Sequence, residues 1–170
     1  SDASLFAGFQ YTYLGENTRS NVFNAYNNSA MIPAQDRHLK SGINLYAGRV
    51  DFEKKFSSGA KFETGASLSH AISSGGAEIY AYEPQQASNS IYDYKEANAA
   101  IYSQLVGKIK KMDWTAGLRL ETTNVNGNYD EDGSSNRVDK SSTNLFPRVS
   151  VTYAIDSAMS VGIRYSKTIN

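Results

Sequence analysis

The stretch Trp114-Thr115-Ala116-Gly117-Leu118-Arg119-Leu120-Glu121-Thr122 decides the fold class of this chain. Its even positions carry Trp, Ala, Leu, Leu and Thr, whereas its odd positions carry Thr, Gly, Arg and Glu. Side chains on a β-strand alternate between two faces, so this alternation predicts a strand with one apolar and one charged face. A helical repeat of 3.6 residues does not fit the pattern.

The same period of two recurs along the chain. Tyr102 and Val106 interrupt it in one segment, but elsewhere the alternation is clear. A content of 12 Tyr and 7 Phe against only 3 Pro also favours extended structure over helix. The sequence therefore predicts an all-β protein, a single domain over residues 1–170 with about seven or eight antiparallel strands in an up-and-down meander. The six further alternating segments are residues 5–13, 46–56, 62–72, 97–109, 148–153 and 159–165.

The connections between these segments alternate in length. Tight joins are expected at Phe56–Gly59, Lys111–Asp113 and Ile155–Ser157, and long polar loops at Gly15–Gly42, Ser73–Lys95 and Val125–Thr143. Short pieces of the long segments, Asn21–Tyr26 and Ala77–Tyr82, could extend the strands as hairpins. Bacterial membrane barrels have short periplasmic turns and long extracellular loops, whereas a soluble sandwich has no reason to sort them. About ten residues at roughly 3.3 Å each, tilted near 45°, span some 23 Å, so we expect a sector of a transmembrane β-barrel.

Composition excludes several other classes. The 17 basic and 17 acidic residues cancel, so nucleic acid is not an expected partner. Cysteine is absent, which excludes disulfides, thiolate metal sites and a cysteine nucleophile. No segment reaches the roughly 18 to 20 apolar residues of a transmembrane helix, but barrel strands are apolar only at alternate positions, so the mean hydropathy of -0.49 leaves a barrel open.

The charged faces of the predicted strands would point into the interior of a barrel. Opposite charges on neighbouring strands would then form a ladder of ion pairs that holds the strand register, although contact of some of them with a solute or a plug stays open. Aromatic residues beside the short turns and at the opposite strand ends predict two girdles at the membrane surfaces. The interior candidates are Arg49, Asp51, Glu53, Glu63, Arg119, Glu121, Arg148 and Arg164; the girdle candidates are Phe56, Phe62, Trp114 and Tyr153 beside the turns, and Tyr11, Tyr13 and Tyr165 at the other ends.

Several stretches resemble the barrel of a known family. They are Trp114–Thr122, Gly127, Asn144-Leu145-Phe146-Pro147, Ser150–Tyr153 and Arg164-Tyr165-Ser166-Lys167, supported by Ala7-Gly8 and Leu45-Tyr46-Ala47-Gly48. They are similar to the C-terminal barrel portion of TonB-dependent receptors, and more narrowly to the outer-membrane β-barrel family attached to such receptors. In that family Lys167 stands where a second arginine is usual, and an Arg-Pro pair would follow Asn170.

The resemblance implies that this chain is a fragment of a barrel of about 22 strands in the cell outer membrane. Its partners would be outer-membrane lipid, the rest of the barrel and its plug, an energy-coupling protein that acts through a missing N-terminal part, and an unknown solute. No cofactor is implied.

Two other constellations have weaker claims. Asn128, Asp130, Asp132 and Asp139 approximate the spacing of a calcium-binding loop, but their position between strands favours a solvated hairpin tip. The histidines, His38 and His70, lie in different segments without an acidic partner at ligand spacing. No Gly-rich phosphate loop or catalytic triad is visible, so an enzyme is not expected.

Two functions follow from these observations. The first is transport, in which the chain is part of a receptor barrel for nutrient uptake. The second is a binding or structural module, either a small closed barrel or a soluble antiparallel sheet. The apolar face that contains Leu5, Val50, Leu68, Leu118, Val151 and Ile163 separates the two, because a barrel sector leaves it on the outside and a sandwich encloses it.

Overall fold

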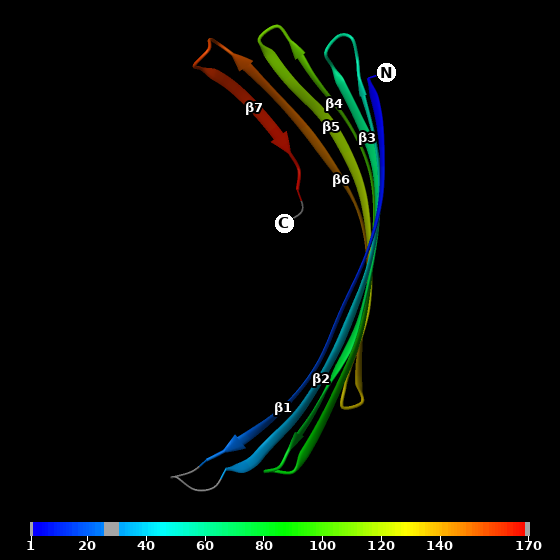
Figure 1. Ribbon diagram of the computed structural model, residues 1–170, viewed down its shortest axis with the longest axis vertical. Helices are drawn as coiled ribbons and strands as arrows, with labels where there is room; N and C mark the ends of the chain where they lie inside the picture. Colours follow the sequence, from blue (N-terminus) through cyan, green and yellow to red (C-terminus); the bar gives the residue numbers. More distant parts are fainter. Residues whose placement is uncertain (1, 26–30, 169–170) are drawn as a thin grey trace.

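The computed structural model describes residues 2–25 and 31–168, which form a single antiparallel sheet without a helix. The seven strands follow one another in chain order across the sheet, so each is hydrogen-bonded to its sequence neighbours (Figure 1). This confirms the predicted meander and its seven strands. Their bounds are β1 (Ala3–Asn24), β2 (Ile32–Lys55), β3 (Lys61–Ala81), β4 (Gln86–Ile109), β5 (Met112–Glu131), β6 (Ser134–Ala154) and β7 (Ser160–Ser166).

Strands β1 to β6 are about twice as long as the sequence pattern predicts or longer, whereas β7 has the predicted length, and the predicted long loops are wrong. Residues 86–95 begin β4, and the segment 125–143 is a continuous β5–β6 hairpin closed by Asp132-Gly133 alone. Both turn residues have positive φ, 49° and 84°, which suits Asp-Gly in a two-residue hairpin turn. The predicted extension at Ala77–Tyr82 is confirmed as far as Ala81, and that at Asn21–Tyr26 as far as Asn24, where β1 ends; Tyr26 lies outside the described residues.

The other ends of the strands are joined by the expected short turns. Residues 56–60 connect β2 to β3, with Gly59 at a φ of 81°. The β4–β5 turn is Lys110-Lys111, one residue earlier than expected, and residues 155–159 connect β6 to β7. In the third turn, the Asp156 carboxylate accepts hydrogen bonds from the backbone N–H groups of Ala158 and Met159 at 2.8 Å. Short turns and hairpin tips lie at opposite ends of the longest axis (Figure 1).

Strand register brings the apolar positions of all seven strands onto one face. Directly paired residues share a face of the sheet, and the pairs Leu5↔Phe52, Ala66↔Ile101 and Leu118↔Pro147 show how the apolar set passes from strand to strand. On each of β1 to β6 this apolar stretch begins near the short turn and runs for about ten residues, for example from Leu5 to Tyr13 on β1. We call it the apolar outer face.

Beyond that stretch the two faces exchange character. On β5 the outer positions change from Leu118 and Leu120 to Asn124 and Asn126, while the opposite face changes from charged residues to Val125 and Tyr129. The same exchange occurs on the other long strands, with these inner residues in the far half: Leu14, Val22, Leu39, Ile43, Ala77, Ile79, Tyr92, Tyr94 and Val138. The far halves therefore continue the sheet with inverted polarity.

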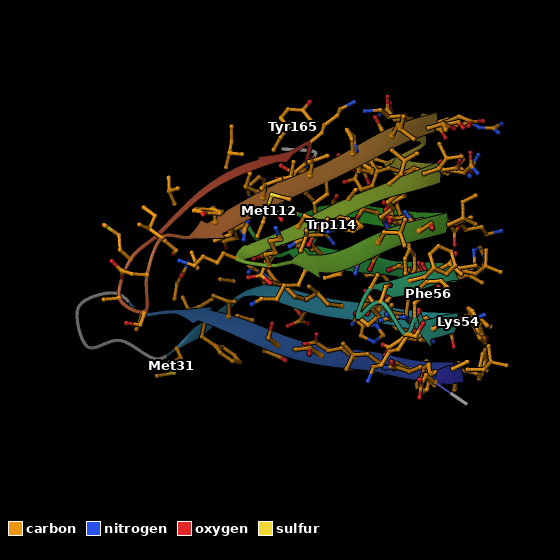
Figure 2. All side chains as sticks on the ribbon, turned by 90° about the horizontal axis from the view of Figure 1, so that it is seen from above. Met31, Lys54, Phe56, Met112, Trp114 and Tyr165 are labelled. Carbon is orange, nitrogen blue, oxygen red and sulfur yellow. The ribbon has the colours of Figure 1, made fainter. Side chains whose placement is uncertain are left out.

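The sheet has no second layer to cover either face (Figure 2). Ala100, at 4% exposure, is the one buried hydrophobic residue in the described part of the chain, and Phe9 and Ile163 are each 76% exposed. The residues that a sandwich would enclose thus lie on an open surface. Among the described residues β1 and β7 each pair on one side only, so neither a sandwich nor a small closed barrel is formed.

Candidate functional site: the polar face of the sheet

All eight residues predicted to face a barrel interior lie on the face opposite the apolar outer face. The register connects them in adjacent rows, because Glu53 pairs with Glu63, Tyr102 pairs with Arg119, and Arg148 pairs with Gly117. Successive rows are two residues apart along the strands, so they point to the same side. Arg49, Asp51, Glu121 and Arg164 complete the set. We call this surface the polar inner face.

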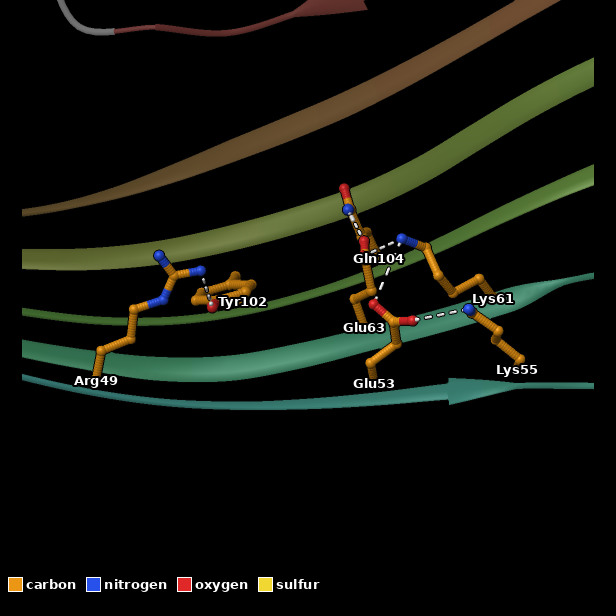
Figure 3. A network of polar contacts seen from close by, with 7 residues as sticks. All are labelled: Arg49, Glu53, Lys55, Lys61, Glu63, Tyr102 and Gln104. Atoms are coloured by element: carbon orange, nitrogen blue, oxygen red, sulfur yellow. Dashed lines mark hydrogen bonds and ion pairs between the residues drawn. The ribbon is translucent and has the colours of Figure 1, made fainter. Parts of the chain in front are cut away.

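Near the short turns, a lysine bridges two carboxylates that would otherwise repel each other. Glu53 and Glu63 are direct cross-strand partners, and Lys61 contacts both, at 3.6 Å from Glu53 (Figure 3). The Gln104 amide donates a further hydrogen bond to Glu63, and Lys55 lies 3.9 Å from Glu53. Like charges directly opposite each other destabilise a sheet, so the lysine compensates for this pair. Lys61 and Gln104 were not among the predicted site residues, although Lys61 lies two positions before Glu63 on the same strand face.

Further along the strands, an aromatic ring separates two arginines. The guanidinium carbons of Arg49 and Arg119 each lie 5.9 Å from the centroid of the Tyr102 ring. Arg49 also donates a hydrogen bond of 3.2 Å to the Tyr102 hydroxyl (Figure 3). Tyr102 packs over Gly65, where a Cβ would lie 2.5 Å from the tyrosine hydroxyl. Tyr102 interrupts the alternating pattern in the sequence because this aromatic residue falls on the polar face.

The prediction that ion pairs would join neighbouring strands is mostly wrong, because most of the pairs lie within one strand. Arg49 pairs with Asp51 at 2.5 Å and Arg119 with Glu121 at 2.9 Å, so both pairs join residues two apart on the same strand. The cross-strand positions opposite Arg49 are Gly8 and Ser67, which carry no charge. Long side chains reach the next same-face position along the strand, and this register offers most of them no opposite charge across it.

A shallow hollow of about 910 Å³ occupies the polar inner face toward β7. Arg49, Arg119, Arg148, Arg164 and Lys167 line it, together with Tyr102 and Phe146, and Glu121 is the one carboxylate among its lining residues. Those residues come from β2, β4, β5, β6, β7 and the segment after it. The hollow therefore concentrates positive charge within a chain whose formal net charge is zero.

The aromatic candidates occupy two levels along the strands. Phe62 and Tyr153 lie one residue from the short-turn ends of β3 and β6, and Trp114 lies two residues into β5. Phe56 immediately follows β2. Tyr11 and Tyr13 lie eight and ten residues into β1, and the Tyr11 ring centroid is 5.0 Å from that of Tyr46.

Tyr165 does not share the level of Tyr11 and Tyr13. It lies five residues into β7 and pairs with Val149, whose partner Ala116 is only two residues from Trp114. Its place at the opposite end from the short turns is therefore wrong, because β7 is short and β6 continues well past it.

The four residues whose spacing resembles a calcium-binding loop lie along the β5–β6 hairpin: Asn128, Asp130, Asp132 and Asp139. Asn128 and Asp130 belong to β5 and pair with Arg137 and Ser135 on β6, so the segment is not a loop. The Asp132 carboxylate accepts hydrogen bonds from the Asn89 backbone N–H at 2.8 Å and from the Ser88 hydroxyl at 3.0 Å, which attaches the hairpin tip to β4. Within the described residues no three acidic or histidine side chains gather as metal ligands. The segment is therefore a hairpin, as the sequence favoured, and its carboxylates do not converge in a loop.

Comparison with known proteins gives one matching family and two solved structures of similar fold. The model of the outer membrane protein beta-barrel family matches residues 1–170. The ferric yersiniabactin uptake receptor FyuA from Yersinia pestis has a similar structure over 96% of this chain, with a TM-score of 0.72 and 10% sequence identity. The ferric citrate transporter FecA in its unliganded form matches over 89%, with a TM-score of 0.49 and 12% identity.

This chain spans 25% of the FyuA chain and 23% of the FecA chain. No curated protein sequence matches it. In the part of the chain that the structure describes, no helix has the length and apolar character to cross a membrane.

Proposed function

Because the chain belongs to the outer membrane protein beta-barrel family, we propose that it is a sector of a receptor barrel that takes up a nutrient across the outer membrane. The fold it shares with part of FyuA supports a sector, since FyuA is four times as long. In such a barrel, β1 and β7 would pair with further strands, which removes the two open edges of the sheet.

The observation that carries this proposal is the apolar outer face. It extends across all seven strands, and on each of β1 to β6 it gives way to polar residues about ten positions from the short-turn end. An apolar band of this height, about 25 Å, matches the lipid-facing surface of outer-membrane barrels. The far halves of the strands, with Asn and Asp on their outer positions, would then project beyond the membrane.

This placement assigns a role to each level of the sheet. The short turns would lie on the periplasmic side, and the hairpin tips on the extracellular side, where solute is captured. The polar inner face would line the interior, in contact with solute or with a plug. Uptake through a plugged barrel needs energy, so we further propose an energy-coupling partner outside this chain.

The orientation of the two faces can be tested at adjacent residues. The chain contains no cysteine, so Ser67→Cys on the polar inner face and Leu68→Cys on the apolar outer face form a matched pair. A fluorophore attached at position 68 should be quenched by lipids with brominated acyl chains, and the same fluorophore at position 67 should not. Equal quenching, or stronger quenching at 67, would reject the proposed orientation.

Uptake itself requires a cellular assay. Deletion of the gene should slow growth when one nutrient is limiting, and the loss should be reproduced in the parent strain when the proton gradient is dissipated. The gene should restore both growth and uptake of the radiolabelled nutrient. Unchanged uptake of every nutrient tested would count against a receptor and favour a structural role in the membrane.

The alternative of a small module lacks support from the described structure. A soluble sheet with Leu5 71% exposed and Leu68 64% exposed would present its whole apolar face to water. Monomeric soluble proteins rarely expose contiguous apolar patches above a few hundred Å². We therefore favour the lipid-facing barrel sector.

A further inference from the structure

The basic hollow on the polar inner face contains more positive charge than its neighbours neutralise. Five of its lining residues are cationic and one, Glu121, is anionic. Glu121 is already engaged, because Arg119 lies 2.9 Å away and the Asn98 amide donates a hydrogen bond of 2.8 Å. Arg49 is likewise paired with Asp51. The two carboxylates therefore neutralise only Arg49 on β2 and Arg119 on β5.

In the described part of the chain, Arg148 and Arg164 remain without an acidic partner. Among residues 2–25 and 31–168, no carboxylate oxygen lies within ion-pair distance of either guanidinium group. They are diagonal neighbours on β6 and β7, because Arg148 pairs with Ser166 and Arg164 pairs with Ser150. The planar guanidinium groups of two arginines on adjacent strands can each bind an oxyanion through two parallel N–H donors.

The depth of Arg148 and Arg164 in the sheet makes their lack of a carboxylate partner among the described residues significant. Arg148 is the cross-strand partner of Gly117, between Ala116 and Leu118 of the apolar outer face. If that face contacts lipid, the two arginines stand on the interior side of the membrane-spanning part of the wall. Charged groups at that depth are costly unless they contact water or an opposite charge.

We infer that this hollow binds a small solute that carries at least two oxyanionic groups, carboxylate or phosphate, with Arg148 and Arg164 as its principal contacts. The inference rests on the proposed transport function and names the chemical class of its solute. The volume of about 910 Å³ is in the range of small-molecule sites. Tyr102 and Phe146, which also line the hollow, would contact the carbon skeleton of the solute.

The test is binding of two chemically distinct probes, tricarballylate and pyrophosphate, to the intact protein in uncharged detergent. Isothermal titration should detect at least one of them at low ionic strength, and about 0.5 M NaCl should weaken binding because such salt screens charge. The double variant Arg148→Gln, Arg164→Gln should bind the probes at least about tenfold more weakly than the wild-type protein does. The preferred probe distinguishes a carboxylate from a phosphate ligand.

A matched control removes the same charge elsewhere. Arg19 and Arg137 lie on the outer positions of the far halves of β1 and β6, so Arg19→Gln, Arg137→Gln should bind the probes as the wild-type protein does. If both double variants bound the probes equally weakly, the inference would be overturned, because the change in the net charge of the protein would then explain the loss of binding. If the wild-type protein bound neither probe, the inference would also be overturned. Protease sensitivity of the Arg148→Gln, Arg164→Gln variant in that case would indicate that carboxylates of polypeptide inside the barrel, and not a solute, contact the two arginines.

The two proposals fail in different ways. Probe binding that depends on Arg148 and Arg164, in a protein whose deletion changes no uptake, would retain the site and reject transport. Normal nutrient uptake by the Arg148→Gln, Arg164→Gln variant, with no probe bound by the wild type, would retain transport and reject the site.

Discussion

An arginine introduced on the apolar outer face should destabilise the protein according to its depth in the membrane. Leu118 lies six residues from the start of β5 at Met112 and is 49% exposed on that face. At roughly 3.3 Å per residue and a tilt near 45°, it lies about 14 Å above the short-turn end of a band about 25 Å high. Leu118→Arg therefore places a cation close to the middle of the bilayer.

The expected cost of Leu118→Arg is about 2–4 kcal/mol of unfolding free energy, the range for arginine at the midplane of a barrel. Asn126 provides the control, because it lies on the same strand and the same outer side, fourteen residues from Met112. That separation corresponds to about 33 Å along the membrane normal, which is beyond the band, so Asn126→Arg should cost less than about 0.5 kcal/mol.

The assay is equilibrium unfolding of the intact protein in phosphatidylcholine vesicles. The folded fraction at each urea concentration is read from mobility on an unheated gel, and the two variants are compared at the same ionic strength. A difference between Leu118→Arg and Asn126→Arg of less than about 0.5 kcal/mol would refute the assignment of the outer face to lipid. A larger cost for Asn126→Arg than for Leu118→Arg would indicate that the membrane surrounds the far halves of the strands and not the halves next to the short turns.

Two further predictions concern charges on the sheet. Lys61→Met should lower the urea midpoint at neutral pH, because Glu53 and Glu63 then face each other without the lysine that contacts both. The deficit in urea midpoint should shrink below about pH 4 as the carboxylates protonate, and a pH-independent deficit would contradict the bridging role. The hydrogen bond of 2.6 Å that the Tyr82 hydroxyl donates to Asp36 raises the pKa of Tyr82 above its usual value, so its contribution is complete below about pH 10 and is lost as pH rises through the raised pKa. The difference in urea midpoint between the wild type and Tyr82→Phe should be constant up to about pH 9 and decrease above pH 10, whereas a constant difference at all pH values would show that this hydrogen bond does not matter.

Much of the architecture could be predicted because strand formation and facial polarity are local properties. A period of two over Trp114–Thr122 requires only the alternation of side chains along one strand. The short turns at 56–60 and 155–159 were likewise indicated by Gly59 and Asp156, whose backbone and side-chain preferences act within a few residues. The antiparallel meander, its approximate number of strands and its apolar face followed from these signals.

The loop predictions failed at a definite point in the pattern. On β5 the apolar residues move from even positions, as at Leu118 and Leu120, to odd positions at Val125 and Tyr129. The period of two continues, but its phase shifts by one residue, and a phase shift looks like the end of a strand when only one segment is considered. Cross-strand hydrogen bonds to β4 and β6 carry the strand through this change.

The sequence by itself determined that this protein is a meander of amphipathic strands, and it placed eight charged residues on a single face. Only the tertiary structure decided which of those charges meet. Arg49 and Arg164 are 115 positions apart in the chain, yet they line the same hollow with Arg119 and Arg148. The reason is that alternation fixes the side of a strand on which a residue lies, whereas the height at which it meets its neighbours depends on register between strands, which is set by pairing across the whole sheet.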